Sequence, residues 1–112
     1  MSEVVVVGAF KAQPGKEAEA VEAFKALVDP THREEGCVLY ALHQGIDDPS
    51  RLAFIERWES REKLDAHLES EHVAEVLARA EELFGDSADI VVYEPLEGGE
   101  AKKGSLAKHA GG

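Results

Sequence analysis

Three side chains that can exchange protons or hold an aromatic ring follow one another over a short stretch of this chain. Glu56 and Trp58 occupy alternate positions of an expected strand, and His67 lies on the helix expected to follow it. Alternate residues of a strand share a face, so Phe54, Glu56 and Trp58 should all point toward the helices. A carboxyl group on an apolar face resists ionisation because its charge is poorly solvated there. The pattern predicts a largely apolar pocket that contains an acid, a His and an aromatic wall.

Each of these residues also has a purely structural interpretation. His67 follows Leu64 by three residues, at or beside the buried stripe of its helix. An imidazole there can accept a phenolic proton near neutral pH, but an inward His is also commonly a hydrogen-bonded core residue. Glu56 can equally be an anchor that accepts backbone N–H groups or pairs with an Arg or His, and Trp58 can be a core aromatic. The residues alone leave both interpretations open.

Tyr40 and His72 are two further candidates for the pocket. Tyr40 and His43 should point to opposite faces of their strand, and Tyr40 is the better pocket candidate. His72 begins a helix and faces either the pocket or solvent. His67 and His72 are five residues apart across an expected helix break, and no carboxylate cluster in the sequence completes a ligand set. We therefore expect no metal site.

Composition excludes several classes of partner. The chain has 112 residues, with 23 acidic against 12 basic side chains and a net charge of −11, so it should repel nucleic acid and anionic membranes. Cys37 is the only cysteine, which rules out an internal disulfide and a thiolate zinc site, and it is expected to serve as a small hydrophobe. The first residues lack the pattern of a signal peptide and no apolar run reaches membrane-spanning length, so we expect a cytoplasmic protein.

The hydrophobic periodicity predicts four strands and three helices. The apolar, β-branched or alternating segments that predict strands are 4–10, 37–44, 52–58 and 89–95. The first helix should follow Pro14-Gly15 and end or kink at Pro30, with one more turn possible over 31–35. Ser60 should cap a short helix to Leu68. Ser70 should cap another to Phe84, with four residues facing inward: Val73, Leu77, Ala80 and Phe84.

This order of elements, βαββαβ, predicts an α+β ferredoxin-like fold in which helices cover one face of an antiparallel sheet. The other face is also apolar and the sequence has no second helical layer to cover it. Two sheets packed face to face would solve this, so we expect a homodimer that forms an α/β-barrel. We expect one domain over 1–96, followed by a Gly- and Lys-rich tail over 97–112 that is flexible or contacts the partner subunit.

Several motifs in this order resemble the antibiotic biosynthesis monooxygenase family, and most of all its small quinol-monooxygenase-like members. They are Pro14-Gly15 before a helix, Arg33-Glu34-Glu35-Gly36-Cys37 leading into Tyr40, and Glu56-Arg57-Trp58-Glu59-Ser60 followed by Leu64, His67, Leu68, Ser70 and His72. The resemblance covers residues 3–96. It implies a dimeric ferredoxin-like barrel that oxidises phenols or hydroquinones with O₂ and uses no metal or flavin.

The resemblance leads to a specific functional hypothesis. We expect a cofactor-independent monooxygenase that acts on a small aromatic substrate and O₂, with His67 and Glu56 as catalytic residues. Trp58, Tyr40 and His72 would bind the substrate. The same scaffold serves haem-degrading enzymes, but Leu77 stands where that branch has its axial His. Two alternatives stay open, namely a non-oxidative isomerase of a phosphorylated sugar and a dimer that binds a metabolite without converting it.

Overall fold

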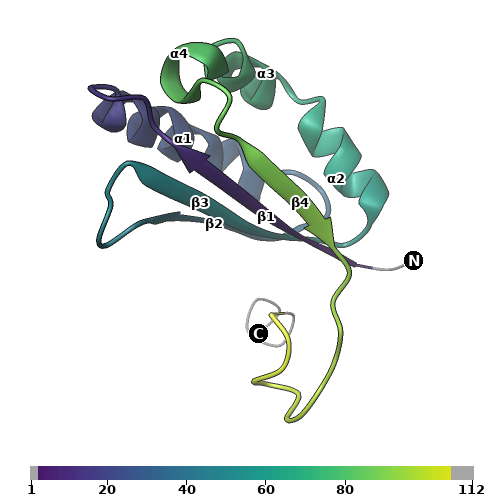
Figure 1. Cartoon of the computed structure of the whole chain (residues 1–112). Helices are drawn as coiled ribbons and strands as arrows, with labels where there is room; N and C mark the ends of the chain where they lie inside the picture. Colours follow the sequence, from purple (N-terminus) through teal and green to yellow (C-terminus); the bar gives the residue numbers. More distant parts are fainter. Residues whose placement is uncertain (1–2, 107–112) are drawn as a thin grey trace.

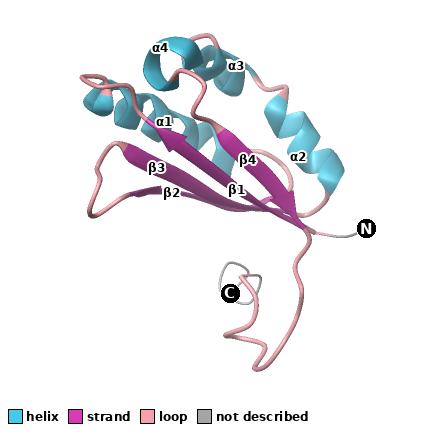
Figure 2. Ribbon diagram, viewed as in Figure 1, coloured by secondary structure: helices cyan, strands magenta, loops and turns pink. Residues whose placement is uncertain are grey.

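The computed structural model describes residues 3–106, which form four strands and four helices (Figure 1). In chain order the elements are β1 (Val4–Lys11), α1 (Glu17–His32), β2 (Cys37–Gln44), β3 (Arg51–Trp58), α2 (Arg61–Leu68), α3 (Glu71–Leu77), α4 (Ala80–Phe84) and β4 (Asp89–Tyr93). The strands form one antiparallel sheet in the order β2-β3-β1-β4. All four helices lie on the same face of this sheet (Figure 2). The predicted ferredoxin-like α+β fold is confirmed.

One of the two alternatives left open at Pro30 is observed, and one predicted helix is divided in two. Helix α1 continues through Pro30 to His32, because Pro30 lies in the last turn, where its missing N–H removes little of the helix. The helix expected from Ser70 to Phe84 is divided into α3 and α4 where the Arg79 N–H bonds the Val76 carbonyl three residues back, at 2.9 Å. After this tight turn Leu83 is fully buried, whereas Leu77 borders the space between helices and sheet but is 62% exposed.

The core lies between the helices and the sheet face that carries Phe54 and Trp58. Phe24 of α1 is its centre, with its ring 4.8 Å from that of Phe10, 4.9 Å from that of Phe54 and 4.7 Å from that of Phe84. Burying a side chain of this size contributes about 1.5–3 kcal/mol to folding. This aromatic cluster fixes the distance of α1 and α4 from the sheet.

Among the described residues, no helix lies over the opposite face of the sheet (Figure 1). After β4 the chain leaves the sheet, and residues 94–106 contain neither helix nor strand. Residues 107–112, the end of the expected tail, lie outside the described residues, and the boundary near residue 96 stays a prediction. No helix within the described part of the chain is long and apolar enough to cross a membrane, and the cytoplasmic location also stays a prediction.

Candidate active site

A cavity of about 390 Å³ lies between the sheet and the helices, and residues of all four helices line it. Most of its lining is aliphatic or aromatic, including Phe54 of the sheet and Phe24, Leu64 and Val73 of the helices. The lining includes Tyr40, Glu56 and His67, three of the five residues predicted for the site. An apolar cavity with polar groups gathered on part of its wall is the usual form of a small-molecule site.

Strand β3 contributes Glu56 and Trp58, which point to the same face as expected. The Trp58 Nε1–H donates to Glu56 Oε1 at 2.9 Å. Burial raises the pKa of Glu56 to about 7, and the Trp58 bond only partly opposes the effect. Trp58 is 0% exposed and does not line the cavity, so its ring supports the site from behind.

Helix α2 carries His67 in its last turn. Ser60 begins this helix, and its Oγ accepts a hydrogen bond from the Lys63 N–H at 3.3 Å, as the predicted cap requires. The imidazole of His67 is 3% exposed and packs between Trp58 and Tyr40, with ring centroids 4.7 and 5.3 Å away. Burial lowers the pKa of His67 although the hydrogen bond to Glu34 opposes this shift. His67 is therefore held mainly as the neutral imidazole, the form that can accept a proton.

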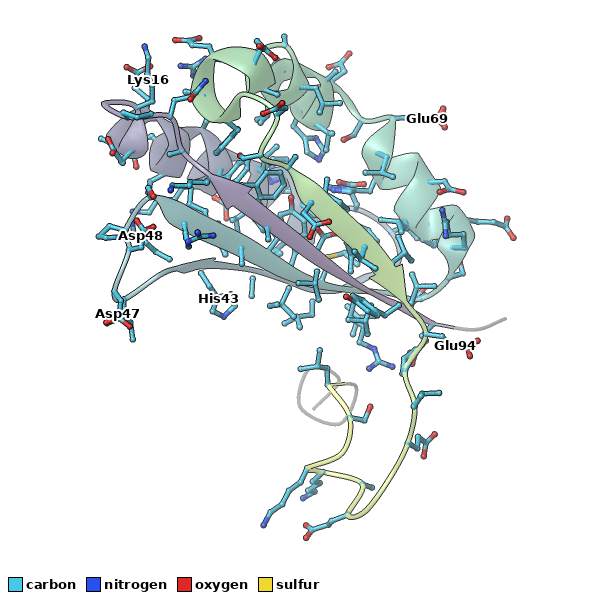
Figure 3. The ribbon with its side chains drawn as sticks, in the orientation of Figure 1. Lys16, His43, Asp47, Asp48, Glu69 and Glu94 are labelled. Atoms are coloured by element: carbon cyan, nitrogen blue, oxygen red, sulfur yellow. The ribbon has the colours of Figure 1, made fainter. Side chains whose placement is uncertain are left out.

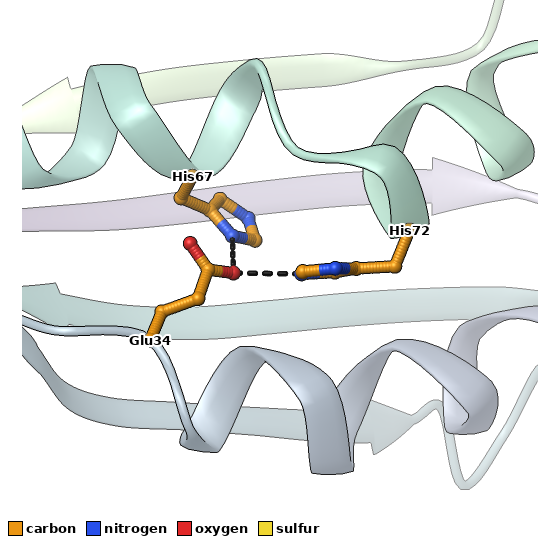
Figure 4. Close-up of side chains that lie close together, drawn as sticks. All are labelled: Glu34, His67 and His72. Carbon is orange, nitrogen blue, oxygen red and sulfur yellow. Dashed lines mark hydrogen bonds and ion pairs between the residues drawn. The ribbon is translucent and has the colours of Figure 1, made fainter.

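Glu34 is a site residue that the sequence analysis missed. Its Oε2 lies 2.8 Å from His67 Nδ1 and 2.7 Å from His72 Nε2, so one carboxylate oxygen joins two imidazoles (Figure 4). The bond to Glu34 places the proton of neutral His67 on Nδ1, and its Nε2 is left with a lone pair. Glu34 belongs to the motif at residues 33–37, but nothing in its spacing points to His67, which is 33 residues further along the chain.

His72 and Ser70 extend this cluster across the turn between α2 and α3. Ser70 Oγ donates to the His67 carbonyl at 2.6 Å and lies 3.2 Å from His72 Nε2, instead of capping α3 with its side chain. His72 is bonded to Glu34 and does not line the cavity. The sequence spacing indicates no carboxylate partner for the two His residues, whereas the structure brings Glu34 to both.

The remaining candidates on β2 divide between the two faces of the sheet. Tyr40 is 4% exposed and lies on the cavity side, where burial, reinforced by the charge of Glu56, raises the pKa of its hydroxyl. His43 points away from the helices (Figure 3). Burial and the nearby Glu34 and Glu56 raise the pKa of the Cys37 thiol to about 11, so it stays protonated at neutral pH and is a poor nucleophile.

The fold and this cavity define a small ferredoxin-like protein with a buried His–carboxylate site. The profile of the antibiotic biosynthesis monooxygenase family matches residues 3–79, which is well over half of the chain. The protein therefore belongs to the antibiotic biosynthesis monooxygenase family.

Individual relatives agree with this assignment. The chain is 31% identical over 96 residues to the Mycobacterium tuberculosis protein named "Putative monooxygenase Rv0793", covering 86% of this chain and 94% of that protein. The crystal structure of PA3566 from Pseudomonas aeruginosa is 27% identical, with a TM-score of 0.81 and coverage of 86% of this chain and 96% of that one. Against the uncharacterized protein sll1783 of Synechocystis, the match of 27% identity covers 84% of this chain but only 64% of that protein.

Proposed function

We propose that this protein is a cofactor-independent monooxygenase that oxidises a quinol or a related phenolic substrate with O₂. The observation that carries the proposal is the placement of His67 in the wall of an apolar cavity, with Nδ1 held by Glu34 and Nε2 free to accept a proton. Membership of the antibiotic biosynthesis monooxygenase family supports the reaction class.

In the proposed reaction, His67 Nε2 takes the proton of a substrate hydroxyl. The phenolate then gives an electron to O₂, and the resulting radical and superoxide combine to a peroxide on the ring. The O–O bond breaks, one oxygen atom stays on the product, and the other leaves as water. The substrate supplies all four electrons, so a hydroquinone and O₂ yield a hydroxyquinone and H₂O. An apolar cavity favours this sequence because it keeps water away from the radical pair.

Glu56 is the second proton-transfer group in this proposal. With its pKa near 7 it can hold a proton at neutral pH and give it to the leaving oxygen. Tyr40 lies in the same wall and orients the substrate ring. Trp58 and His72 act from behind the wall. Trp58 is bonded to Glu56, which lines the cavity, and His72 is bonded to Glu34, which holds His67.

The phosphorylated-sugar alternative has less support. The described residues that line this cavity include no Lys or Arg. A phosphate group taken into such a cavity would have no cationic partner there, which is costly for a doubly charged anion. An aromatic substrate with one or two hydroxyl groups suits the lining better.

We also propose that the protein is a homodimer joined through the open sheet face. Residues of β1 and β3 on this face, among them Val5, Val7 and Ile55, are apolar, and no helix in the described part of the chain covers them. Arg57 lies on the same face and its side chain is only 2% exposed. It pairs with Glu3, but its Nε and Nη1 have no hydrogen-bond partner among the described residues. A second sheet could cover the apolar groups and supply acceptors to Arg57.

Oxygen uptake with a panel of hydroquinones and anthrone-like phenols tests the function. Untagged, chelator-treated protein should consume O₂, and one atom of ¹⁸O₂ should appear in the product. His67→Ala should lower the rate by about 10²–10⁴-fold, the usual contribution of a general base. Ile46→Ala, in the exposed loop between β2 and β3 and away from the cavity and the open sheet face, should keep the wild-type rate. Uptake that is unchanged in His67→Ala would refute the role of His67, and no uptake with any substrate would refute the oxygenase.

A further inference from the structure

The cluster of Glu34, His67 and His72 has the donor atoms of a transition-metal site. The carboxylate oxygen, His67 Nδ1 and His72 Nε2 lie within 4.8 Å of one another, and within the described residues this is the single group of its kind. The three side chains converge from the segment after α1, from α2 and from α3 (Figure 4). Two imidazoles and one carboxylate form a ligand set typical of Zn²⁺ and other first-row divalent ions. We propose that this cluster binds one such ion.

The two distances from the Glu34 oxygen require only a small adjustment. Zinc binds His nitrogen and carboxylate oxygen at about 2.0–2.2 Å, which sets tetrahedral donors about 3.3 Å apart. Here the Glu34 oxygen is 2.8 Å from one nitrogen and 2.7 Å from the other, so it must retreat by roughly half an ångström. Glu34 can do so because it lies between α1 and β2, outside any helix or strand. The metal would replace the hydrogen bonds that now join the three groups.

The cluster is also open to ions from solvent. The side chains of Glu34 and His72 are 18% and 23% exposed, whereas that of His67 is 3% exposed, so an ion can reach the site from outside without crossing the cavity. Ser70 Oγ, 3.2 Å from His72 Nε2, or a water molecule can complete the coordination. The net charge of −11 raises the local concentration of cations.

A metal ion at this site would prevent His67 from acting as the base. A metal bound to His67 Nδ1 moves the imidazole proton to Nε2, the atom that faces the substrate in our proposal. His67 could then no longer accept the substrate proton. This inhibitory consequence rests on the proposed function, whereas metal binding itself does not.

Titration calorimetry with Zn²⁺ tests the binding on the untagged full chain after chelator treatment. We expect one ion per chain. Loss of one ligand in His72→Ala should weaken binding by more than about 100-fold, beyond the 10–100-fold typical of second-shell changes. Glu34→Gln should also weaken it, whereas His43→Ala should leave it unchanged. Absence of binding, or equal losses in His43→Ala and His72→Ala, would overturn the site.

Oxygen uptake then tests the consequence separately. One equivalent of Zn²⁺ should suppress uptake by the wild type, and a chelator should restore it. The remaining uptake of His72→Ala should resist the same zinc concentration. Zinc that binds at the cluster without lowering uptake would refute the inhibition and leave the site standing. A preparation with no uptake at all would refute the proposed function, while calorimetry still decides the metal site.

Discussion

At the residue scale, the site depends on ionisable groups held in an apolar setting. His67 is kept neutral by burial and oriented by Glu34, and Glu56 is kept from ionising by the same burial. Both effects follow from the cost of charge in a poorly solvated environment. The two shifts have opposite directions because imidazole is charged when protonated and a carboxyl group is charged when deprotonated.

The raised pKa of Glu56 should make stability depend on pH. The folded protein holds this proton up to about pH 7, whereas the unfolded chain loses it near the ordinary value of 4.5. Between these values the native state binds more protons, so its stability falls as pH rises. The Gln side chain of Glu56→Gln cannot ionise. The free energy of unfolding of this variant, relative to that of the wild type, should therefore be about 2 kcal/mol higher at pH 8 than at pH 5.

Urea unfolding at the two pH values measures this difference, and Glu59→Gln, at an exposed neighbouring position, controls for loss of one negative charge. A relative stability of Glu56→Gln that is the same at both pH values would contradict the assignment.

At the element scale, the turn after α1 brings Glu34 to α2. Gly36 ends this turn with φ +89°, a backbone conformation that residues other than glycine rarely adopt. Its Cα also lies against Lys63 in the first turn of α2, where a Cβ would come within 2.6 Å of the Lys63 Cβ. The close approach keeps α2, and therefore His67, beside Glu34.

Gly36→Ala should therefore destabilise the protein and disturb the site. We expect the left-handed backbone to cost about 1–2 kcal/mol, and displacement of Lys63 to add to this. Gly15→Ala is the matched control, because Gly15 has φ +82° but a Cβ added there would have no atom within 4 Å. Thermal unfolding should show a larger loss for Gly36→Ala than for Gly15→Ala. Equal losses of stability would mean that the close contact between Gly36 and α2 does not contribute to the effect.

At the scale of the whole molecule, the helices cover one face of a sheet that is apolar on both. The central strands β1 and β3 present Val7 and Ile55 on the open face as a directly paired position. Both side chains are partly exposed, and a continuous apolar surface of this kind on a small protein usually marks an interface. In an isologous dimer each open-face substitution is present twice, so its effect on association is doubled.

Ile55→Asp should dissociate the proposed dimer. Two buried, unpaired carboxylates would cost several kcal/mol, enough to weaken association at least about 100-fold. Sedimentation equilibrium measures the change. Ile46 lies in the loop between β2 and β3 and is 96% exposed. The control variant Ile46→Asp introduces the same charge away from the sheet face and should remain dimeric. A wild type that sediments as a monomer would refute the interface.

The local pattern of the sequence determined most of the fold. Strands alternate or are β-branched, the helices have one apolar stripe, and Ser60 marks the start of α2, because these signals arise within a few neighbouring residues. The same locality placed Tyr40, Glu56 and Trp58 on one face of the sheet. It missed the break between α3 and α4, after which Leu83 and Phe84 are both buried in the core.

Only the tertiary structure decided which side chains meet. Glu34 lies 33 residues before His67 and 38 before His72, and a spacing of that length carries no information about contact. The tertiary packing also separated the predicted residues into those that line the cavity, such as His67, and those that support it from behind, such as Trp58. Such pairings depend on how whole elements pack, so they are fixed by the core and not by any short stretch of sequence.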